Sequence, residues 1–139
     1  MDYRAVLDTN NWVSYFIAEK YDEIVAMKEK GVVFLHSKPS VAELREVLTR
    51  RKFQKYNFNV EKLLYFYIQI SEFVKTTPQF TDCPDPKDNF LFDLAIQGNA
   101  HYLVSGDKKV LETPLKNKSI KVRNLTAFKA ELSNTTATQ

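Results

Sequence analysis

Four acidic residues stand where the sequence changes from an apolar run to a turn or a helix: Asp8, Glu43, Asp88 and Asp107. Taken singly, each has an ordinary structural explanation, since Asp and Glu are common at helix N-termini and in turns. Taken together, they form a set of hard oxygen ligands with no His or Cys at metal-ligand spacing. Such a set favours Mg²⁺ or Mn²⁺ over zinc.

The electrostatics of this set indicates what it could do. Carboxylates a few ångströms apart repel one another by on the order of 4 kcal/mol per close pair at an effective dielectric constant of 20. The arrangement persists only if cations neutralise it or the pKa values rise. A Mg²⁺ ion held by a few carboxylates retains waters, activates one as a nucleophile and stabilises a phosphate in line. The predicted chemistry is therefore metal-dependent hydrolysis at a phosphate.

Local patterns leave alternatives open for these acids. The segment 40–43 (SVAE) matches a capping box, in which Glu43 would only return a hydrogen bond to the backbone at Ser40. Both roles can coexist, because a carboxylate has two oxygens. Asp93 lies five positions after Asp88, so on a regular helix it points away from Asp88 unless the helix begins irregularly. Asp107 also reads as a turn residue after Gly106.

Apolar runs and helical periodicity define the elements that must position the acids. We expect strands at 4–7, 32–35, 74–76, 102–105 and 120–122. We expect helices at 11–18, 21–30, 41–51, 60–73, 88–97, 108–111 and 125–132. This alternation predicts an α/β fold with a parallel sheet of four to five strands and helices on both faces. The acids would then meet at the carboxyl edge of that sheet, where open α/β sheets bind ligands.

Length and composition fit one domain, 1–132, followed by a tail, 133–139, that we expect to fray. No apolar run approaches the roughly 20 residues that span a bilayer, and the N-terminus lacks the pattern of a signal peptide. Cys83 is the single cysteine, which excludes an internal disulfide and favours a reducing cytoplasm. His36 and His101 share no zinc-ligand spacing. With three glycines, neither a dinucleotide fingerprint nor a P-loop can be written.

Basic residues are concentrated in two segments, although the net charge is only +3. Residues 45–55 hold five bases against one acid, and residues 108–129 hold seven against one. Each segment alone is most simply a solvated face. Beside an acidic metal pocket, however, they would hold a polyphosphate backbone while metal lets its scissile phosphate approach the acids.

At this point the chain resembles a known family, the PIN domain, and within it the bacterial putative toxin components that include or neighbour VapC-type ribonucleases. The resemblance extends to about Leu132. Its carriers are 6–10 (VLDTN), 40–48 (SVAELREVL), 85–95 (DPKDNFLFDLA) and 102–107 (YLVSGD). Two positions depart from the pattern: Asn11 stands where the family more often has an apolar residue, and Phe90 where a basic one is common.

The resemblance implies a Mg²⁺- or Mn²⁺-dependent endoribonuclease that acts on single-stranded or looped RNA. It assigns metal binding to Asp8, Asp88 and Asp107, with Asp93 as an additional acid, and positioning of metal or water to Glu43. Ser105 and Asn10 would orient these ligands through hydrogen bonds. The candidate phosphate contacts are Arg45, Arg51, Lys108 and Lys109. The resemblance further implies a homodimer restrained by an antitoxin whose tail enters the active-site groove.

The main rival is a non-catalytic module with the same fold that holds RNA or a protein without cutting. The presence of all four acids argues against it, because an RNA binder gains nothing from carboxylates unless metal bridges them. A receiver-like domain would need a phosphoryl-accepting Asp at the end of a middle strand, which residues 74–76 do not provide. A haloacid-dehalogenase-type phosphatase would need Asp at position 10, where the chain has Asn10.

Overall fold

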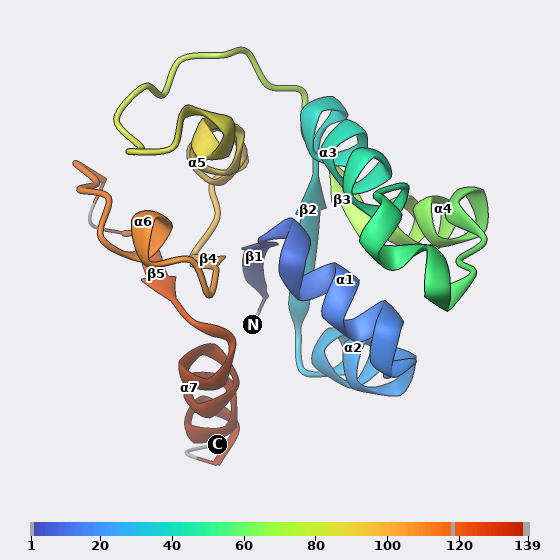
Figure 1. The fold of residues 1–139 in the computed structure, drawn as a ribbon. Helices are drawn as coiled ribbons and strands as arrows, with labels where there is room; N and C mark the ends of the chain where they lie inside the picture. Colours follow the sequence, from blue (N-terminus) through green and yellow to red (C-terminus); the bar gives the residue numbers. More distant parts are fainter. Residues whose placement is uncertain (1, 118, 138–139) are drawn as a thin grey trace.

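One five-stranded parallel sheet organises the chain in the computed structural model, which describes residues 2–117 and 119–137 (Figure 1). The strand order is β3-β2-β1-β4-β5. The strands are β1 (Tyr3–Leu7), β2 (Val32–His36), β3 (Ser71–Phe73), β4 (Tyr102–Val104) and β5 (Lys121–Arg123). The predicted α/β fold with a parallel sheet is confirmed, and β1 at its centre carries Asp8 at its carboxyl end.

Helices cover both faces of the sheet. They are α1 (Thr9–Ala18), α2 (Tyr21–Glu29), α3 (Lys38–Leu48), α4 (Val60–Ile70), α5 (Asn89–Gln97), α6 (Lys108–Leu111) and α7 (Leu125–Ala137), with 3₁₀ turns η1 (Arg51–Tyr56) and η2 (Pro86–Asp88). In Figure 1, α1 to α4 lie to one side of the strands, and α5 and α6 to the other. Among the helices that the structure describes, none has the length and apolar character that a bilayer-spanning segment needs.

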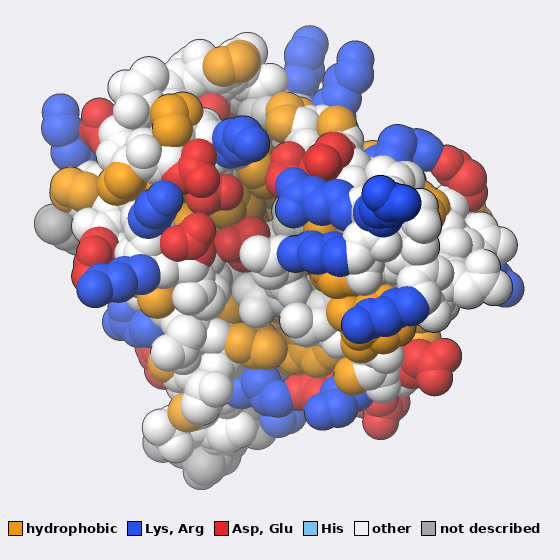
Figure 2. All heavy atoms as spheres, viewed as in Figure 1, with side chains coloured by type: hydrophobic (Ala, Val, Ile, Leu, Met, Phe, Trp, Pro, Cys, Tyr) orange, Lys and Arg blue, Asp and Glu red, His pale blue; other side chains and the backbone are white. Residues whose placement is uncertain are grey.

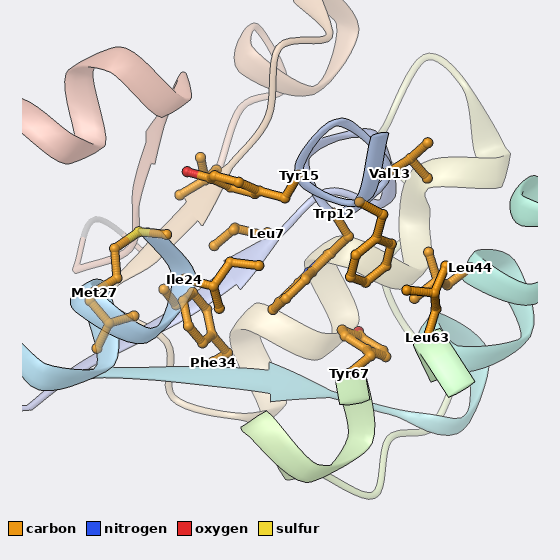
Figure 3. Packing of buried hydrophobic residues seen from close by; sticks show 14 of the residues in the cluster. Leu7, Trp12, Val13, Tyr15, Ile24, Met27, Phe34, Leu44, Leu63 and Tyr67 are labelled. Atoms are coloured by element: carbon orange, nitrogen blue, oxygen red, sulfur yellow. The ribbon is translucent and has the colours of Figure 1, made fainter. Parts of the chain in front are cut away.

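Alternation along β1 explains why the sheet has a core on each face. Ala5 and Leu7 pack into the larger core, whereas Val6 between them packs into the smaller one. The larger core is aromatic. In it, Trp12 lies edge-on to the rings of Phe34 and Tyr67, with centroid distances of 5.2 Å and 4.9 Å (Figure 3). The aromatic residues of α1 and α4 are therefore scaffold for β1 and β2.

Two predicted boundaries differ from the structure near the sheet edge. Helix α3 begins at Lys38 instead of residue 41, because Ser37 is its N-cap: the Ser37 hydroxyl accepts from Ser40 N–H, and the Ser40 hydroxyl accepts from Ser37 N–H. The predicted capping box from Ser40 to Glu43 is therefore wrong. Glu43 lies in the second turn of α3, with its carboxylate free of that capping role.

The predicted third strand is also displaced. Helix α4 ends at Ile70 and the chain enters β3 at once, so β3 is 71–73 instead of 74–76. The hydroxyl of Ser71 lies 2.7 Å from Nδ1 of His36 on β2. Helix α7 continues to Ala137, beyond the predicted end at Leu132. Fraying of the tail stays a prediction, and residues 138–139 lie outside the described residues.

Candidate active site

Asp8 is held at the point where β1 meets α1. Its backbone N–H donates to the carbonyl of Val104 at 2.8 Å, which joins the ends of β1 and β4. Its side chain is 7% exposed, and Oδ2 accepts a 2.6 Å hydrogen bond from the Ser105 hydroxyl. Burial raises the pKa of Asp8, and this effect is opposed by the hydrogen bonds from Ser105 and from the backbone N–H groups of Asn10 and Thr9.

Ser105 connects Asp8 to Asp107. The Ser105 hydroxyl is fully buried at the end of β4, and besides donating to Asp8 it accepts from the backbone N–H of Asp107 at 3.0 Å. Asp107 is the N-cap of α6 and accepts from Lys109 N–H at 2.9 Å through Oδ1. The Asp107 charge in turn raises the pKa of Asp8. The structure thus brings Asp8, Ser105 and Asp107 together through one hydroxyl.

Asp88 lies at the end of η2, directly before α5. Its side chain makes no capping hydrogen bond to α5, so the carboxylate is not committed to the helix. Burial, followed by the charges of Asp8, Asp85, Asp107 and Glu43 in that order, raises the pKa of Asp88 to about 6. Three of these neighbours are the acids selected from the sequence, and they come from three different elements. The carboxylate of Asp88 therefore interacts electrostatically with each of the other three acids.

Glu43 reaches the same region from α3. Burial raises the pKa of Glu43, Glu46 and Asp8 raise it further, and Arg50 and Lys87 lower it. Figure 2 shows acidic side chains gathered around a hollow in the middle of this face, with basic side chains on either side. All four acids of the predicted set therefore contribute to one negative field.

The four acids do not form a closed cage. Within residues 2–117 and 119–137, no group of three or more His, Cys, Asp or Glu side chains makes a ready metal site. The donor set still fits a hard divalent cation, since it is composed of carboxylates, and burial and neighbouring acids raise the pKa values of Asp8, Glu43 and Asp88. Closure of the side chains around an ion would relieve that repulsion.

Asp93 has a different environment from the other acids. It is 6% exposed on α5, and Oδ1 accepts from the backbone N–H groups of Gln79 and Phe80, at 3.1 Å and 2.8 Å. Gln97 Nε2 donates to the same oxygen at 3.3 Å. Asp93 therefore fixes the loop between β3 and η2 onto α5. This role accounts for its burial without a metal.

The structure gives the two asparagines after Asp8 different surroundings. The side chain of Asn10 is exposed, and it is the backbone N–H of Asn10 that touches Asp8. Asn11, noted above only as a departure from the family pattern, donates from Nδ2 to the carbonyl of Val104 at 3.0 Å. Asn11 therefore ties the start of α1 to the end of β4. A polar residue at a position expected to be apolar was the available signal.

Two bases that the sequence analysis did not select act on Glu43. Arg50 donates from Nε and Nη2 to Glu46, at 3.1 Å and 2.8 Å, and together with Lys87 it lowers the pKa of Glu43. Lys87 is adjacent to Asp88 in η2 and is exposed. That adjacency in the sequence could have identified it.

The four predicted phosphate contacts are all exposed but lie in varied settings. Arg45 forms a two-point ion pair with Glu61 on α4. Lys108 Nζ lies 3.9 Å from Glu112 Oε1, and the backbone N–H of Lys109 donates to the capping carboxylate of Asp107. Arg51 begins η1. Of these four, Lys108 and Lys109 directly follow one of the acids.

Comparisons with known proteins concern the family and the fold of the chain. The sequence model of the PIN domain matches residues 4–109, more than half of the chain. No curated protein matches it. Among solved structures, one chain of VapBC2 from Rickettsia felis, crystallised with a DNA fragment from their promoter, superposes with a TM-score of 0.58 at 18% identity, covering 87% of this chain and 98% of that one. At that identity the likeness concerns the fold.

Proposed function

Because the chain belongs to the PIN domain family, we propose that it is a metal-dependent endoribonuclease that hydrolyses phosphodiester bonds in single-stranded or looped RNA. The observation that carries this proposal is the environment of Asp88, whose pKa is raised by burial and then by the charges of Asp8, Asp85, Asp107 and Glu43. Carboxylates that converge from separate elements in this way are costly without a cation. In a nuclease that uses Mg²⁺ or Mn²⁺, the bound ion would offset this repulsion between the carboxylates.

In this proposal, Asp8, Asp88 and Asp107 hold Mg²⁺ or Mn²⁺, and Asp93 is left to its loop. When bound, the ion would supply charge for the scissile phosphate and an acidified water. Glu43, half-buried and with a raised pKa, accepts a proton from the attacking water. Ser105 holds Asp8 in one rotamer, and the backbone N–H of Asn10 supports it.

The basic residues at the rim complete the proposed substrate path. Lys87 lies beside Glu43 and would meet the phosphate next to the scissile one. Lys108 and Lys109 directly follow Asp107 at the start of α6. Figure 2 shows basic side chains on either side of the acidic ones, and this distribution supports an extended strand that crosses the acids.

A second candidate function is favoured by one observation. The described residues hold no ready three-ligand metal site, which is the arrangement expected of a PIN fold that binds RNA or a protein without cutting. The buried hydrogen bond from Ser105 to Asp8 favours the nuclease, because a binder has no use for a carboxylate fixed at the bottom of a hollow.

Partners follow from the same comparison. The structure of VapBC2 from Rickettsia felis holds that protein with a promoter DNA fragment. From the family resemblance we further propose that the present chain is an RNA-cleaving toxin in the cytoplasm, restrained by an antitoxin protein and forming a homodimer. Size-exclusion chromatography with light scattering tests the homodimer, and co-expression with the neighbouring reading frame tests the antitoxin.

The nuclease proposal is tested with the full chain, labelled single-stranded RNA, and Mg²⁺, Mn²⁺ or EDTA. Asp8→Asn and Asp107→Asn should each lower cleavage at least about 100-fold, and EDTA should abolish it. Asp22→Asn, at an exposed acid in the first turn of α2, is the matched control and should cleave normally. Cleavage that survives EDTA or Asp8→Asn would refute the mechanism. RNA binding without cleavage would select the binding module.

A thermal measurement tests the metal separately. Mn²⁺ should raise the melting temperature of the wild type, because a ligand of the folded state stabilises it by about 2.7 kcal/mol at a hundred times its Kd. The Asp8→Asn, Asp107→Asn double variant should respond much less. An equal response in both proteins would place the ion elsewhere.

A further inference from the structure

A cavity lies beside η2 and the start of α5. It has a volume of about 320 Å³ and is lined by Phe80 and Phe90, by Pro39 and Pro86, and by Lys87 and Asn89. This volume is at the lower end of the roughly 300–1,000 Å³ typical of small-molecule sites. We call it the Phe80–Phe90 cavity.

Two segments of the chain contain both residues that line this cavity and acids of the site. In η2 and the start of α5, Lys87 and Asn89 line the cavity, and Asp88 lies between them in the chain. On α3, Pro39 lines the cavity, and Glu43 follows four residues later on the same helix face. The cavity is therefore lined by residues of the same two segments, η2 with the start of α5, and α3, that carry Asp88 and Glu43.

The walls of the cavity are aromatic and fixed in position. Phe80 stacks on Phe92, with centroids 4.4 Å apart and planes 14° apart, and Phe92 is fully buried. The backbone N–H of Phe80 is held by Asp93 at 2.8 Å. One side of the Phe80 ring is therefore covered while the residue still borders the cavity. Phe90 borders it too, and packs only partly into the smaller core.

The polar atoms at the rim suit a nucleotide. Oδ1 of Asn89 accepts from the backbone N–H of Cys83 at 3.1 Å, which leaves its amide hydrogens to donate to another group. The ammonium of Lys87 supplies a positive charge at the same rim. An aromatic wall, an amide donor and a cation are the groups that bind a base through its π-face, its edge and its phosphate.

We propose that the Phe80–Phe90 cavity receives one nucleobase of the RNA strand, next to the bond that is cut. This inference rests on the proposed function for the position of the scissile bond, but not for the existence of the base site. The base stacks against Phe90, its edge accepts from Asn89, and Lys87 pairs with the adjoining phosphate. One unpaired base leaving the strand explains why the substrate must be single-stranded or looped.

The experiment scans a short single-stranded RNA with an abasic nucleotide, one position at a time. Affinity for the full chain is measured by fluorescence anisotropy with Ca²⁺ present, and cleavage in parallel with Mn²⁺. We expect one position, adjoining the cleaved bond, where loss of the base lowers affinity about tenfold. In Phe90→Leu the intact RNA should bind about tenfold more weakly, and the abasic nucleotide at that position should cost little more.

Two variants keep the result interpretable. Phe90→Tyr retains the ring and should restore the sensitivity to the missing base, which a merely structural role of Phe90 would not require. Phe73→Leu, at an aromatic side chain that is 59% exposed on β3, should bind as the wild type does. Melting temperatures of all variants establish that each is folded.

The outcomes separate the two proposals. Sensitivity at no position, or equal sensitivity in wild type and Phe90→Leu, overturns the base site even if cleavage is normal. A single sensitive position without cleavage supports the base site and refutes the nuclease. Absence of both binding and cleavage overturns both.

Discussion

The Ser105 hydroxyl donates to Asp8 Oδ2 at 2.6 Å across a separation of 97 residues, and both residues are buried where β4 and β1 end. This one hydroxyl also accepts from the N–H of Asp107. It therefore couples the carboxylate with the lowest exposure in the site to the loop that carries the last acid. A change at Ser105 should affect both.

Ser105→Ala should destabilise the protein by about 1.5–3 kcal/mol, because a buried carboxylate loses its hydrogen bond and the Asp107 N–H loses its acceptor. The pKa of Asp8 should rise further, since the Ser105 hydrogen bond lowers it. The acid limb of the pH–rate profile then moves to higher pH. Chemical unfolding and the pH profile measure the two effects.

Ser14→Ala on α1 is the matched control, since Ser14 is exposed. It should change neither stability nor the pH profile. If Ser105→Ala lost stability but kept an unchanged pH profile, Ser105 would be structural only.

A second prediction concerns the pH dependence of stability, through Asp88. Its pKa is raised from 3.8 to about 6. Between these values the folded protein holds a proton that the unfolded chain has released, so the free energy of unfolding falls as pH rises through this window. The difference bounds the effect at about 3 kcal/mol, and solvent screening of this partly exposed group reduces it to about 1–2 kcal/mol.

Asp88→Asn should remove this loss. Without metal, the variant should melt several degrees above the wild type at neutral pH and close to it near pH 4. The Asp88 side chain makes no capping hydrogen bond to α5, so the substitution removes no such bond. Scanning calorimetry across this pH range measures it, with Asp82→Asn, at an exposed acid, as the control. A variant that melts below the wild type at neutral pH would contradict the proposed repulsion.

Most of the fold could be predicted because its signals are local. The run of Val32 to Leu35 is apolar and β-branched, and α5 carries helical periodicity up to Gly98. The cap of α3 could not be resolved in this way. Ser37 and Ser40 are both good N-cap residues, so the local sequence does not distinguish them. In the structure Ser37 is the N-cap, and the Ser40 hydroxyl forms a 2.8 Å hydrogen bond with the hydroxyl of Tyr67, which is distant in the sequence.

In the candidate site, too, the features marked by local sequence could be predicted, and those that depend on tertiary contacts could not. The positions of Asp8 and Asp107 follow from strand ends, which the sequence marks. The partner of Arg45 is Glu61 on another helix, and the partners of Asp93 are loop amides thirteen and fourteen residues away. No local pattern encodes such pairings, so a charge count over residues 45–55 could not separate paired bases from bases beside the acids.

A third prediction distinguishes the two roles of Asp93. Asp93→Asn keeps an oxygen for the N–H groups of Gln79 and Phe80, so we expect cleavage within about threefold of the wild type. Asp93→Ala leaves those amides unpaired and should cost about 1–3 kcal/mol of stability. Cleavage assays and urea unfolding of both variants measure this. A 100-fold loss of cleavage in Asp93→Asn would instead make Asp93 a metal ligand.

The last prediction compares two bases, Lys87 and Arg45. Lys87 lowers the pKa of Glu43 and adjoins Asp88, whereas Arg45 is bound to Glu61 on the face between α3 and α4. Lys87→Gln should therefore weaken RNA binding and reduce the slope of log K against log salt by about 0.7, the value for one phosphate contact on a single strand. Arg45→Gln should leave the slope unchanged, because its charge is already neutralised by a carboxylate. Anisotropy titrations over a series of salt concentrations measure both slopes. Equal losses in the two variants would mean that the strand also runs along α3, and that the cation beside Asp88 has no special part in holding it.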